Sequence, residues 1–263
     1  MDTVVFIPAR YASTRFPGKP LQTLRGPDGE KSLIQRSWEA AMAAKGVDAV
    51  YVATDDDRIA DAARAFGADV VMTAESCANG TERCADALEG LAISPRVVVN
   101  LQGDAPLTPP HFVEALIDEM VGAGDQRMVA TPVLACDAQT YENFIEDRRN
   151  GRVGGTTAVF SATGNALYFS KEVVPFKAPG SFDPTKPDVF HHVGLYAYTP
   201  AALSVYMKAS PGVLEATEGL EQLRFLETGV PIKCVEVPAG DHMFWELNNP
   251  EDIARIEAIL KQS

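Results

Sequence analysis

The amino-acid sequence predicts an α/β protein in three layers, with a mostly parallel sheet between two layers of helices. Short apolar runs alternate with stretches of helical periodicity through the first half of the chain, and this alternation requires crossover connections between parallel strands. Glycines such as Gly67 and Gly122 follow the ends of the predicted helices. With 46% hydrophobic residues, the chain has enough apolar side chains to bury a large core.

The first half contains four predicted strands, each followed by a predicted helix. The fourth apolar run, Arg-Val-Val-Val-Asn-Leu at 96–101, is continuous, as expected for a strand buried on both faces. Pro110 stands in the first turn of a helix, where proline loses no backbone hydrogen bond. In chain order we predict strand 4–7, helix 32–45, strand 49–53, helix 57–66, strand 69–72, helix 81–91, strand 96–101, and a helix from Pro109-Pro110 to Val121.

The second half predicts a hairpin and an arm inserted into this fold. Strands 158–161 and 166–170 flank Ala-Thr-Gly-Asn, in which Gly164 and Asn165 tolerate positive φ. Residues 171–188 are rich in Pro, Lys and Asp, which predicts an irregular arm. Because no Gly-, Ser- or Pro-rich linker divides the chain, we expect a single domain over residues 1–263. The remaining predicted elements are strand 193–198, helix 219–228, strand 232–237 and an amphipathic helix at 250–260.

Composition excludes several classes of protein. The net charge of −13 argues against a basic face that would neutralise a nucleic-acid backbone, so we expect no nucleic-acid binding. The N-terminus lacks the features of a signal peptide, and no apolar run reaches the roughly 18 residues that span a membrane. The four cysteines are scattered without a Cys-x-x-Cys pair, which predicts buried free thiols rather than disulfides or zinc. We therefore expect a cytoplasmic protein that does not bind membranes.

Three cations follow the first predicted strand. Arg10, Arg15 and Lys19 lie close together in an otherwise acidic chain, with Gly18 beside them. Ligands of parallel sheets bind outside the carboxyl ends of the strands, arginine makes bidentate contacts with phosphate, and glycine lets backbone amides approach closely. A solvated basic loop is the alternative for any single arginine. The cluster predicts an anion site, but Pro20 excludes the usual P-loop, and no Gly-x-Gly-x-x-Gly follows the strand.

Polar residues also follow the other predicted strands. Asp104 ends the run Gln-Gly-Asp, where a carboxylate opposite a cationic loop suits Mg²⁺ bound to phosphates. The alternative is a turn aspartate that caps the next helix. Thr54 and Asp55 follow the second strand, with a helix N-cap as their alternative. Thr81 is the predicted N-cap of the helix that begins in Gly-Thr-Glu-Arg at 80–83.

The run Pro-Ala-Arg-Tyr-Ala-Ser-Thr-Arg-Phe-Pro-Gly-Lys-Pro-Leu at 8–21 resembles the signature of the CMP-sugar-acid synthetases. Within these it is most similar to the 3-deoxy-manno-octulosonate (KDO) cytidylyltransferases, and the similarity extends from Val4 to about Leu260. The resemblance implies a fold of the nucleotide-diphospho-sugar transferase type. It also implies a Mg²⁺-dependent enzyme of lipopolysaccharide assembly that transfers CMP from CTP to the anomeric hydroxyl of a sugar acid and releases pyrophosphate. A homodimer built through the arm and hairpin is implied too, with a nucleotide-binding half at 1–135 and an acceptor-binding and dimerisation half at 136–263.

The resemblance assigns roles to individual residues. In-line attack on the α-phosphorus of CTP needs positioning and charge neutralisation rather than a protein nucleophile. The implied catalytic residues are Arg10, Arg15, Lys19 and Asp104. The implied nucleotide contacts are Pro8, Ala9, Arg10, Ser13, Arg15, Lys19, Thr54, Asp55, Gly80, Arg83 and Gln102. The implied acceptor contacts are Gln102, His191, His192, Tyr196, Glu221 and Gln222, and the implied metal ligands are Asp104 and Asn248. From the residues alone, Tyr196 is a core aromatic, and Glu221 and Gln222 are surface helix residues.

Four positions depart from the family pattern, all on the metal and acceptor side. Ala105 replaces a Glu, His191 an Arg and Asn248 an Asp, and a Lys is missing around Thr157. An amide oxygen binds Mg²⁺ without adding negative charge. These departures keep two alternatives open. One is the same chemistry on another acceptor, such as an amino-KDO analogue, another keto-deoxy sugar acid or a phosphonate. The other is a CTP-binding protein without turnover.

Overall fold

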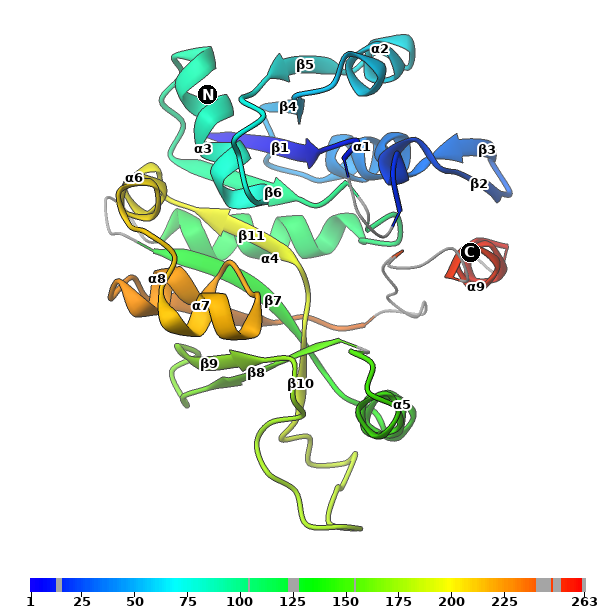
Figure 1. Ribbon diagram of the computed structural model, residues 1–263, viewed down its shortest axis with the longest axis vertical. Coiled ribbons are helices and arrows are strands. Elements are labelled where there is room, and N and C mark those ends of the chain that lie inside the picture. Colours follow the sequence, from blue (N-terminus) through cyan, green and yellow to red (C-terminus); the bar gives the residue numbers. More distant parts are fainter. Residues whose placement is uncertain are drawn as a thin grey trace.

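The computed structural model describes residues 1–12, 16–103, 105–122, 128–153, 155–239, 247 and 252–261. Within these residues a ten-stranded mixed sheet lies between helices on both faces, and a separate two-stranded hairpin projects to one side (Figure 1). The strand order is β5-β4-β1-β6-β11-β7-β10-β8-β9, and β12 also pairs with β7. The predicted α/β class with three layers is confirmed.

The parallel part of the sheet consists of β5 (Asp69–Met72), β4 (Ala49–Thr54), β1 (Thr3–Ala9) and β6 (Val97–Leu101). Val5 of β1 pairs with Val50 on one side and Val99 on the other. Every residue of β1 and β6 is buried, which explains their continuous apolar runs. The four strands predicted for the first half are confirmed, and their carboxyl ends lie at one edge of the sheet.

Successive residues of β1 face opposite helical layers, because strand side chains alternate. Val5 and Ile7 belong to one buried apolar cluster, whereas Val4 and Phe6 belong to another. The first cluster includes side chains from α1 (Leu33–Ala43), α2 (Asp57–Ala65) and α4 (Pro110–Val121). The second includes side chains from α3 (Gly80–Leu91), α6 (Pro200–Lys208) and α8 (Leu223–Glu227).

The antiparallel part of the sheet begins at β11 (Leu195–Tyr198), which runs opposite to β6 on one side and to β7 (Val129–Ala135) on the other. The preceding β10 (Phe190–His192) also pairs with β7. Between β10 and β11 the Leu195 N–H donates to Val193 O at 2.7 Å, which interrupts the ladder. The predicted strand 193–198 is therefore too long at its start, and β10 was not predicted.

The predicted hairpin is formed by β8 (Thr156–Phe160) and β9 (Ala166–Ser170), and Gly164 in its turn has φ +80°. β8 pairs with β10, and β12 (Ile232–Glu236) runs parallel to β7. Most strands of the sheet thus point one way, while β9, β10 and β11 run opposite. The predicted mostly parallel sheet agrees with this arrangement, and the predicted hairpin joins the same sheet through β8.

The predicted helix at 219–228 is confirmed only from Leu223, because its first four residues are not helical. Gly219 has φ +62° and ends α7 (Val213–Glu218), and α8 begins only at Leu223. The reason is that a left-handed residue terminates a helix. Sequence analysis also did not predict α6, α7, β7, α5 (Ala138–Arg149) or the hairpin of β2 (Thr23–Gly26) and β3 (Gly29–Ser32).

The terminal helix α9 (Asp252–Leu260) packs beside β2 of the β2–β3 hairpin, which belongs to the opposite end of the chain. Leu24, Leu247 and Ile256 are buried together in this contact. Residues 250 and 251 of the predicted terminal helix lie outside the described residues. No helix in the described part of the chain combines the length and apolar character needed to cross a membrane.

Candidate active site

The carboxyl end of β1 leads into the predicted triphosphate loop. Ala9 is buried beside Thr54 of β4, and Arg10 is exposed directly after it. Lys19 begins the short 3-10 helix Lys19–Leu21, and its Nζ donates to Leu247 O at 3.1 Å. Ser13 and Arg15 lie outside the described residues. The structure therefore places Arg10 and Lys19 at the predicted edge of the sheet and leaves their phosphate contacts as predictions.

Two predicted nucleotide contacts, Asp55 and Arg83, form an ion pair. Arg83 Nη1 lies 3.3 Å from Asp55 Oδ1 and also donates to Thr73 Oγ1, and only 3% of Arg83 is exposed. Thr54 is fully buried, and its Oγ1 accepts from Asp56 N at 3.2 Å. The N-cap of α2 is Asp56, so the capping alternative for Thr54 and Asp55 is wrong.

The first turn of α3 is capped by Asn79, so the predicted Thr81 cap is wrong. Asn79 Oδ1 accepts from Glu82 N at 2.9 Å, and Glu82 Oε2 accepts in return from Ala78 N at 2.7 Å. This arrangement is a variant of the capping box, in which Glu82 accepts from the residue before the Asn79 cap rather than from the cap itself. Thr81 instead points into the fold, where its Oγ1 lies 2.8 Å from Tyr198 Oη.

Gly80 allows α3 to begin directly against β1 and β6. A Cβ at this position would lie 3.0 Å from Gln102 Nε2, 3.1 Å from Asn100 Nδ2 and 3.4 Å from Pro8 Cγ. The residues predicted to hold the nucleotide, Pro8, Gly80 and Gln102, are therefore in close proximity. Whether Gly80 contacts a base stays a prediction.

Glu221 joins α3 to the end of β6. Its Oε2 accepts from Thr81 N at 3.1 Å, and its Oε1 lies 3.5 Å from Gln102 Nε2. Burial raises the pKa of this carboxyl to about 7, against the hydrogen bond from the Thr81 backbone, which lowers it. The structure thus brings together Gln102, predicted for both ligands, and Glu221, predicted for the acceptor.

Tyr196, Gln222 and His192 also lie on this side of the sheet. Tyr196 Oη donates to Gln222 Oε1 at 3.1 Å, and the buried Gln222 Nε2 has no hydrogen-bond partner among the described atoms. A buried donor without a partner is costly, so this amide is suited to a ligand. His192 Nε2 lies 2.9 Å from Thr131 Oγ1, and burial lowers the His192 pKa to about 3. His192 is therefore neutral near pH 7.

His191 faces the other side of its strand from His192. Its ring packs edge-to-face on Phe144 of α5, with 5.1 Å between centroids, and burial lowers its pKa to about 4. The structure therefore separates His191 from Tyr196 and Gln222. A neutral imidazole at this position does not supply the positive charge of the arginine that it replaces.

Buried polar groups that were not predicted from the sequence hold these residues in place. Asn100 is fully buried within β6, and its Nδ2 donates to Tyr198 Oη at 3.1 Å. Arg224 forms two hydrogen bonds of 2.6 Å with Glu215 and one of 3.0 Å with Glu82. Asn100 had a signal in the sequence, since it is the polar residue of an apolar strand. Arg224 had none, because its partners lie in other elements.

Lys171 lies close to the segment that leads to Glu221. It follows β9, and its Nζ would lie 2.9 Å from a Cβ placed on Gly219, two residues before Glu221. Thr157 stands where the family pattern has a nearby Lys, and its hydroxyl is used in hydrogen bonds within the protein. Its Oγ1 donates to Glu172 O at 2.7 Å and accepts from Val174 N at 3.1 Å. Thr157 therefore fixes the start of the arm.

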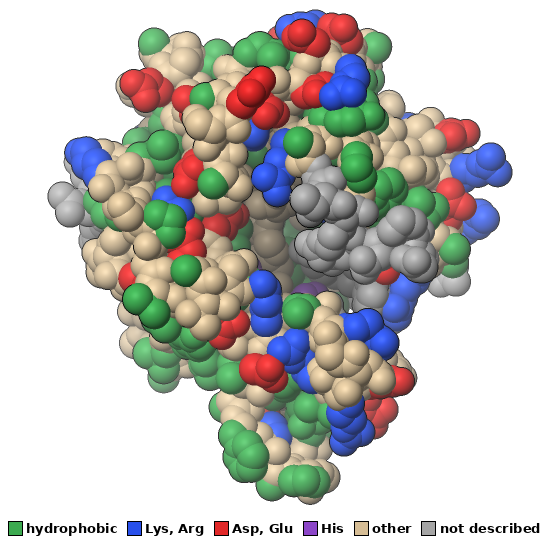
Figure 2. Space-filling model, in the orientation of Figure 1, with side chains coloured by type: hydrophobic (Ala, Val, Ile, Leu, Met, Phe, Trp, Pro, Cys, Tyr) green, Lys and Arg blue, Asp and Glu red, His purple; other side chains and the backbone are tan. Residues whose placement is uncertain are grey.

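The site opens on a hollowed face of the molecule. Figure 2 shows the hollow between the parallel part of the sheet and the region of β8, β9 and β10, with Lys and Arg side chains at its rim. Asp104 and Asn248 lie outside the described residues, and the described residues contain no cluster of three His, Cys, Asp or Glu that could hold a metal. The metal ligands stay predictions.

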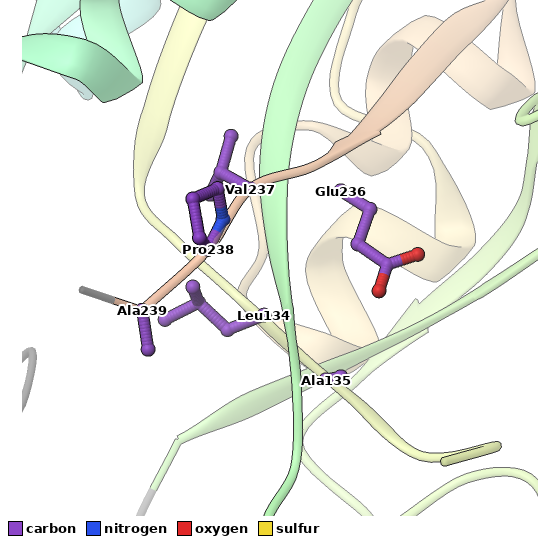
Figure 3. A pocket seen from close by; sticks show the side chains of 6 residues that line it. All are labelled: Leu134, Ala135, Glu236, Val237, Pro238 and Ala239. Atoms are coloured by element: carbon purple, nitrogen blue, oxygen red, sulfur yellow. The ribbon is translucent and has the colours of Figure 1, made fainter. Parts of the chain in front are cut away.

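A separate pocket of about 450 Å³ lies where β7 and β12 end (Figure 3). Leu134, Val237, Pro238 and Ala239 contribute apolar side chains, but polar and apolar atoms share its wall about equally, and Glu236 lies on the opposite side of the chain from Pro238. None of the predicted site residues lines it, so we assign it no part in the chemistry.

Comparison with known proteins agrees with this geometry. A family model described as cytidylyltransferase matches residues 4–233. A 3-deoxy-manno-octulosonate cytidylyltransferase of Maricaulis maris is 43% identical over 99% of this chain and 97% of its own length. An 8-amino-3,8-dideoxy-manno-octulosonate cytidylyltransferase of Shewanella woodyi is 42% identical, over 99% of each chain.

A solved structure of a CMP:2-keto-3-deoxy-manno-octonic acid synthetase complexed with CTP is also similar. It superposes with a TM-score of 0.82 at 32% identity, covering 100% of this chain and 99% of that chain. The similarity extends through both the parallel and the antiparallel parts of the sheet. The predicted resemblance is confirmed, and the chain belongs to the cytidylyltransferase family, in the group of the 3-deoxy-manno-octulosonate cytidylyltransferases.

Proposed function

We propose that this protein transfers CMP from CTP to the anomeric hydroxyl of KDO and releases pyrophosphate. The observation that carries the proposal is the junction at Glu221. There the first turn of α3, the end of β6 and the segment before α8 meet through the contacts of Glu221 with Thr81 and Gln102. Residues of both predicted ligand sites therefore lie within hydrogen-bonding distance of one another, as transfer between two bound substrates requires.

Different side chains serve the two substrates, CTP as donor and the sugar acid as acceptor. Arg10 and Lys19, with Arg15, offset the negative charge that develops on the departing pyrophosphate. Gln222 Nε2 donates to an acceptor oxygen, because it is buried and has no protein partner among the described atoms. Lys171, close to Gly219, supplies a cation for the carboxylate of the sugar acid.

We further propose that Mg²⁺ is the cofactor and that Asp104 and Asn248 hold it. The fit rests on chemistry and on their chain neighbours. Carboxylate and amide oxygens suit Mg²⁺. A Cβ at Gly103 would lie 3.1 Å from Pro8 O, and Leu247 O accepts from Lys19. Both neighbours thus contact the N-terminal segment that is predicted to bind the triphosphate. The ion would neutralise phosphate charge and orient the α-phosphate.

The amino-sugar analogue is the second candidate for the acceptor. The Shewanella relative, named for this substrate, is almost as similar to the chain as the Maricaulis relative, at 42% and 43% identity. The departures at Ala105 and His191 lie in the segments predicted to bind metal and acceptor. The proposed CTP chemistry is the same for both candidates.

Pyrophosphate release from CTP tests the proposal. We expect Mg²⁺-dependent release with KDO, abolished by a chelator, and a lower kcat/KM with 8-amino-3,8-dideoxy-KDO, other keto-deoxy sugar acids and a phosphonate. A higher kcat/KM with the amino sugar favours the second candidate. Binding of CTP without release for any acceptor contradicts the proposed enzyme and favours a CTP-binding protein.

We also propose a homodimer formed through the hairpin and arm. β9 is the last strand of the described sheet, Leu167 on it is 66% exposed, and Phe176 in the arm is 88% exposed. Exposed apolar residues beside an edge strand suit a protein interface. A monomeric mass in light scattering contradicts this.

The four cysteines are free and buried, which supports the proposed cytoplasmic location because thiols persist in reducing compartments.

A further inference from the structure

The ring of Tyr11 lies at the base of the N-terminal loop. Gly18 N donates to Tyr11 O at 2.9 Å, which closes the loop between these two residues. Gly18 has φ +68°, and a Cβ there would lie 3.0 Å from the Tyr11 ring. Glycine is therefore required twice, for the left-handed backbone and for the close approach of the ring. The position of Tyr11 thus sets where the loop begins and ends.

Arg58 of α2 lies on this ring from outside the loop. Its Cζ is 3.3 Å from the centroid of the Tyr11 ring. Its Nε donates to Asp56 Oδ1 at 2.9 Å and its Nη2 to Asp56 Oδ2 at 2.6 Å. The fork of the guanidinium is thus held by the carboxylate while its flat face covers the ring. Both contacts use the planar geometry that distinguishes arginine from lysine.

This arrangement connects two parts of the predicted nucleotide site. Asp56 caps α2 and directly follows Asp55, which pairs with Arg83. Tyr11 directly follows Arg10 at the end of β1. Through Arg58, the loop that starts at β1 is therefore held to the residues that end β4. An exposed ion pair such as Arg58–Asp56 contributes little to stability by itself, so its stacking on Tyr11 is the contact with a consequence for the loop.

We propose that Arg58 is a positioning residue for CTP, which it serves by stacking on Tyr11 and fixing the base of the loop that closes between Tyr11 and Gly18. The inference rests on the proposed use of CTP. Arg58 acts through Tyr11 and not by touching the nucleotide. Its effect therefore falls on the binding of CTP rather than on the chemical step.

The same helix offers a matched control. Arg64 is another exposed arginine of α2, and it pairs with Asp61 at 3.1 Å within the helix. Arg58→Gln and Arg64→Gln remove the same charge from the same element. An exposed cation–π contact corresponds to roughly a 2- to 5-fold change in affinity. We expect Arg58→Gln to raise the KM for CTP by about that factor, with kcat and the acceptor KM unchanged. Arg64→Gln should leave all three unchanged.

Two more variants separate stacking from charge and from folding. Arg58→Lys keeps the charge but loses the planar fork, so it should resemble Arg58→Gln. In a Tyr11→Leu background, Arg58→Gln should cause no further rise in the KM for CTP, because the ring is already gone. Thermal unfolding midpoints should be equal for Arg58→Gln and Arg64→Gln.

Each contrary result overturns the inference. Equal KM values for Arg58→Gln and Arg64→Gln remove any special role of Arg58. Full activity of Arg58→Lys shows that the planar guanidinium is not needed, and additive effects with Tyr11→Leu show that Arg58 does not act through the ring. A fall in kcat without a change in KM places Arg58 in the chemical step instead. Failure of the proposed function is distinct, because the wild-type protein would then release no pyrophosphate from CTP.

Discussion

The parallel and antiparallel parts of the sheet build the two sides of the site in different ways. In the parallel part, site residues follow directly from strand ends that are neighbours in the sheet, as Ala9 and Thr54 are. On the acceptor side, Glu221 is positioned by Thr81, 140 residues away, and by Gln102, 119 residues away. Residues that follow strand ends can be predicted from the sequence alone. Residues that meet through long-range hydrogen bonds cannot be predicted in this way.

The two sides also differ in what holds them. Apolar packing fixes most of β1 and β6, whose residues are all buried, and Asn100 of β6 is a polar exception that faces the acceptor side. The acceptor side depends on buried polar contacts, with Asn100 bound to Tyr198 and Arg224 bound to Glu215 and Glu82. Such contacts are stable only when both partners are present. We therefore expect single substitutions to lower folding stability more on the acceptor side than on the donor side.

The largest expected effect is on the donor side. We expect Asp104→Ala to lower kcat for pyrophosphate release by at least about 10³-fold, because a Mg²⁺ ligand and its charge are lost. Asp118→Ala, on the exposed face of the neighbouring α4, is the matched control and should retain activity. Steady-state pyrophosphate assays measure both. Near wild-type turnover of Asp104→Ala would show that Asp104 is not a ligand of the catalytic metal.

The second effect tests the buried polar contacts of the acceptor side. Arg224→Met leaves Glu215, which is only 8% exposed, without its cation. Removing one partner of a buried pair costs about 3–5 kcal/mol of unfolding free energy. Arg148→Met is the control: Arg148 pairs with Glu172, whose side chain is 67% exposed, and such pairs contribute about 0–1 kcal/mol.

Urea unfolding of both variants makes this comparison. A second substitution, Glu215→Leu in the Arg224→Met protein, should recover part of the lost stability because it removes the unpaired charge. If Arg224→Met costs no more than Arg148→Met, the acceptor side does not depend on buried polar contacts as described.

The smallest effect concerns pH. The folded-state pKa of Glu221 is raised from 4.5 to about 7 by burial, so the folded protein holds this proton more tightly than the unfolded chain. The stability from this group is present below the unfolded pKa and is lost as pH rises through about 7. Glutamine does not ionise. We therefore expect the unfolding free energy of Glu221→Gln to rise relative to wild type as pH is increased from about 5 to about 8.

Glu227→Gln gives the opposite sign and serves as the control. Its carboxylate accepts from Leu214 N at 2.9 Å and Glu215 N at 3.0 Å, and these hydrogen bonds lower its pKa. This substitution should cost stability at neutral pH and progressively less as pH falls through the folded-state pKa. Parallel urea titrations check both variants. A pH-independent difference for Glu221→Gln would show that its carboxyl is not buried as the junction requires.

Two wrong predictions from the sequence had a correct local signal beside them. Asn79 caps α3, although the sequence also offers Thr81, because Asn79 accepts from Glu82 N while Glu82 accepts from Ala78 N. That signal, Asn-x-x-Glu, was present in the sequence. Gly219 also gave a local signal, since glycine at a left-handed position ends a helix. By contrast, the opposite facing of His191 and His192 followed from strand alternation only once β10 was known.

The sequence by itself determined the α/β class, the four strands of the parallel part, and the polar residues at their ends. Periodicity and strand–helix alternation are local properties, and parallel pairing follows from them. Only the tertiary structure decided which acceptor-side residues meet. Distant segments are joined by the pairing of Glu221 with Thr81 and Gln102, by the contact of Arg224 with Glu82, and by the stacking of Arg58 on Tyr11. Local propensity carries no information about such contacts, because their free energy arises from burial and geometry that exist only after the chain has folded.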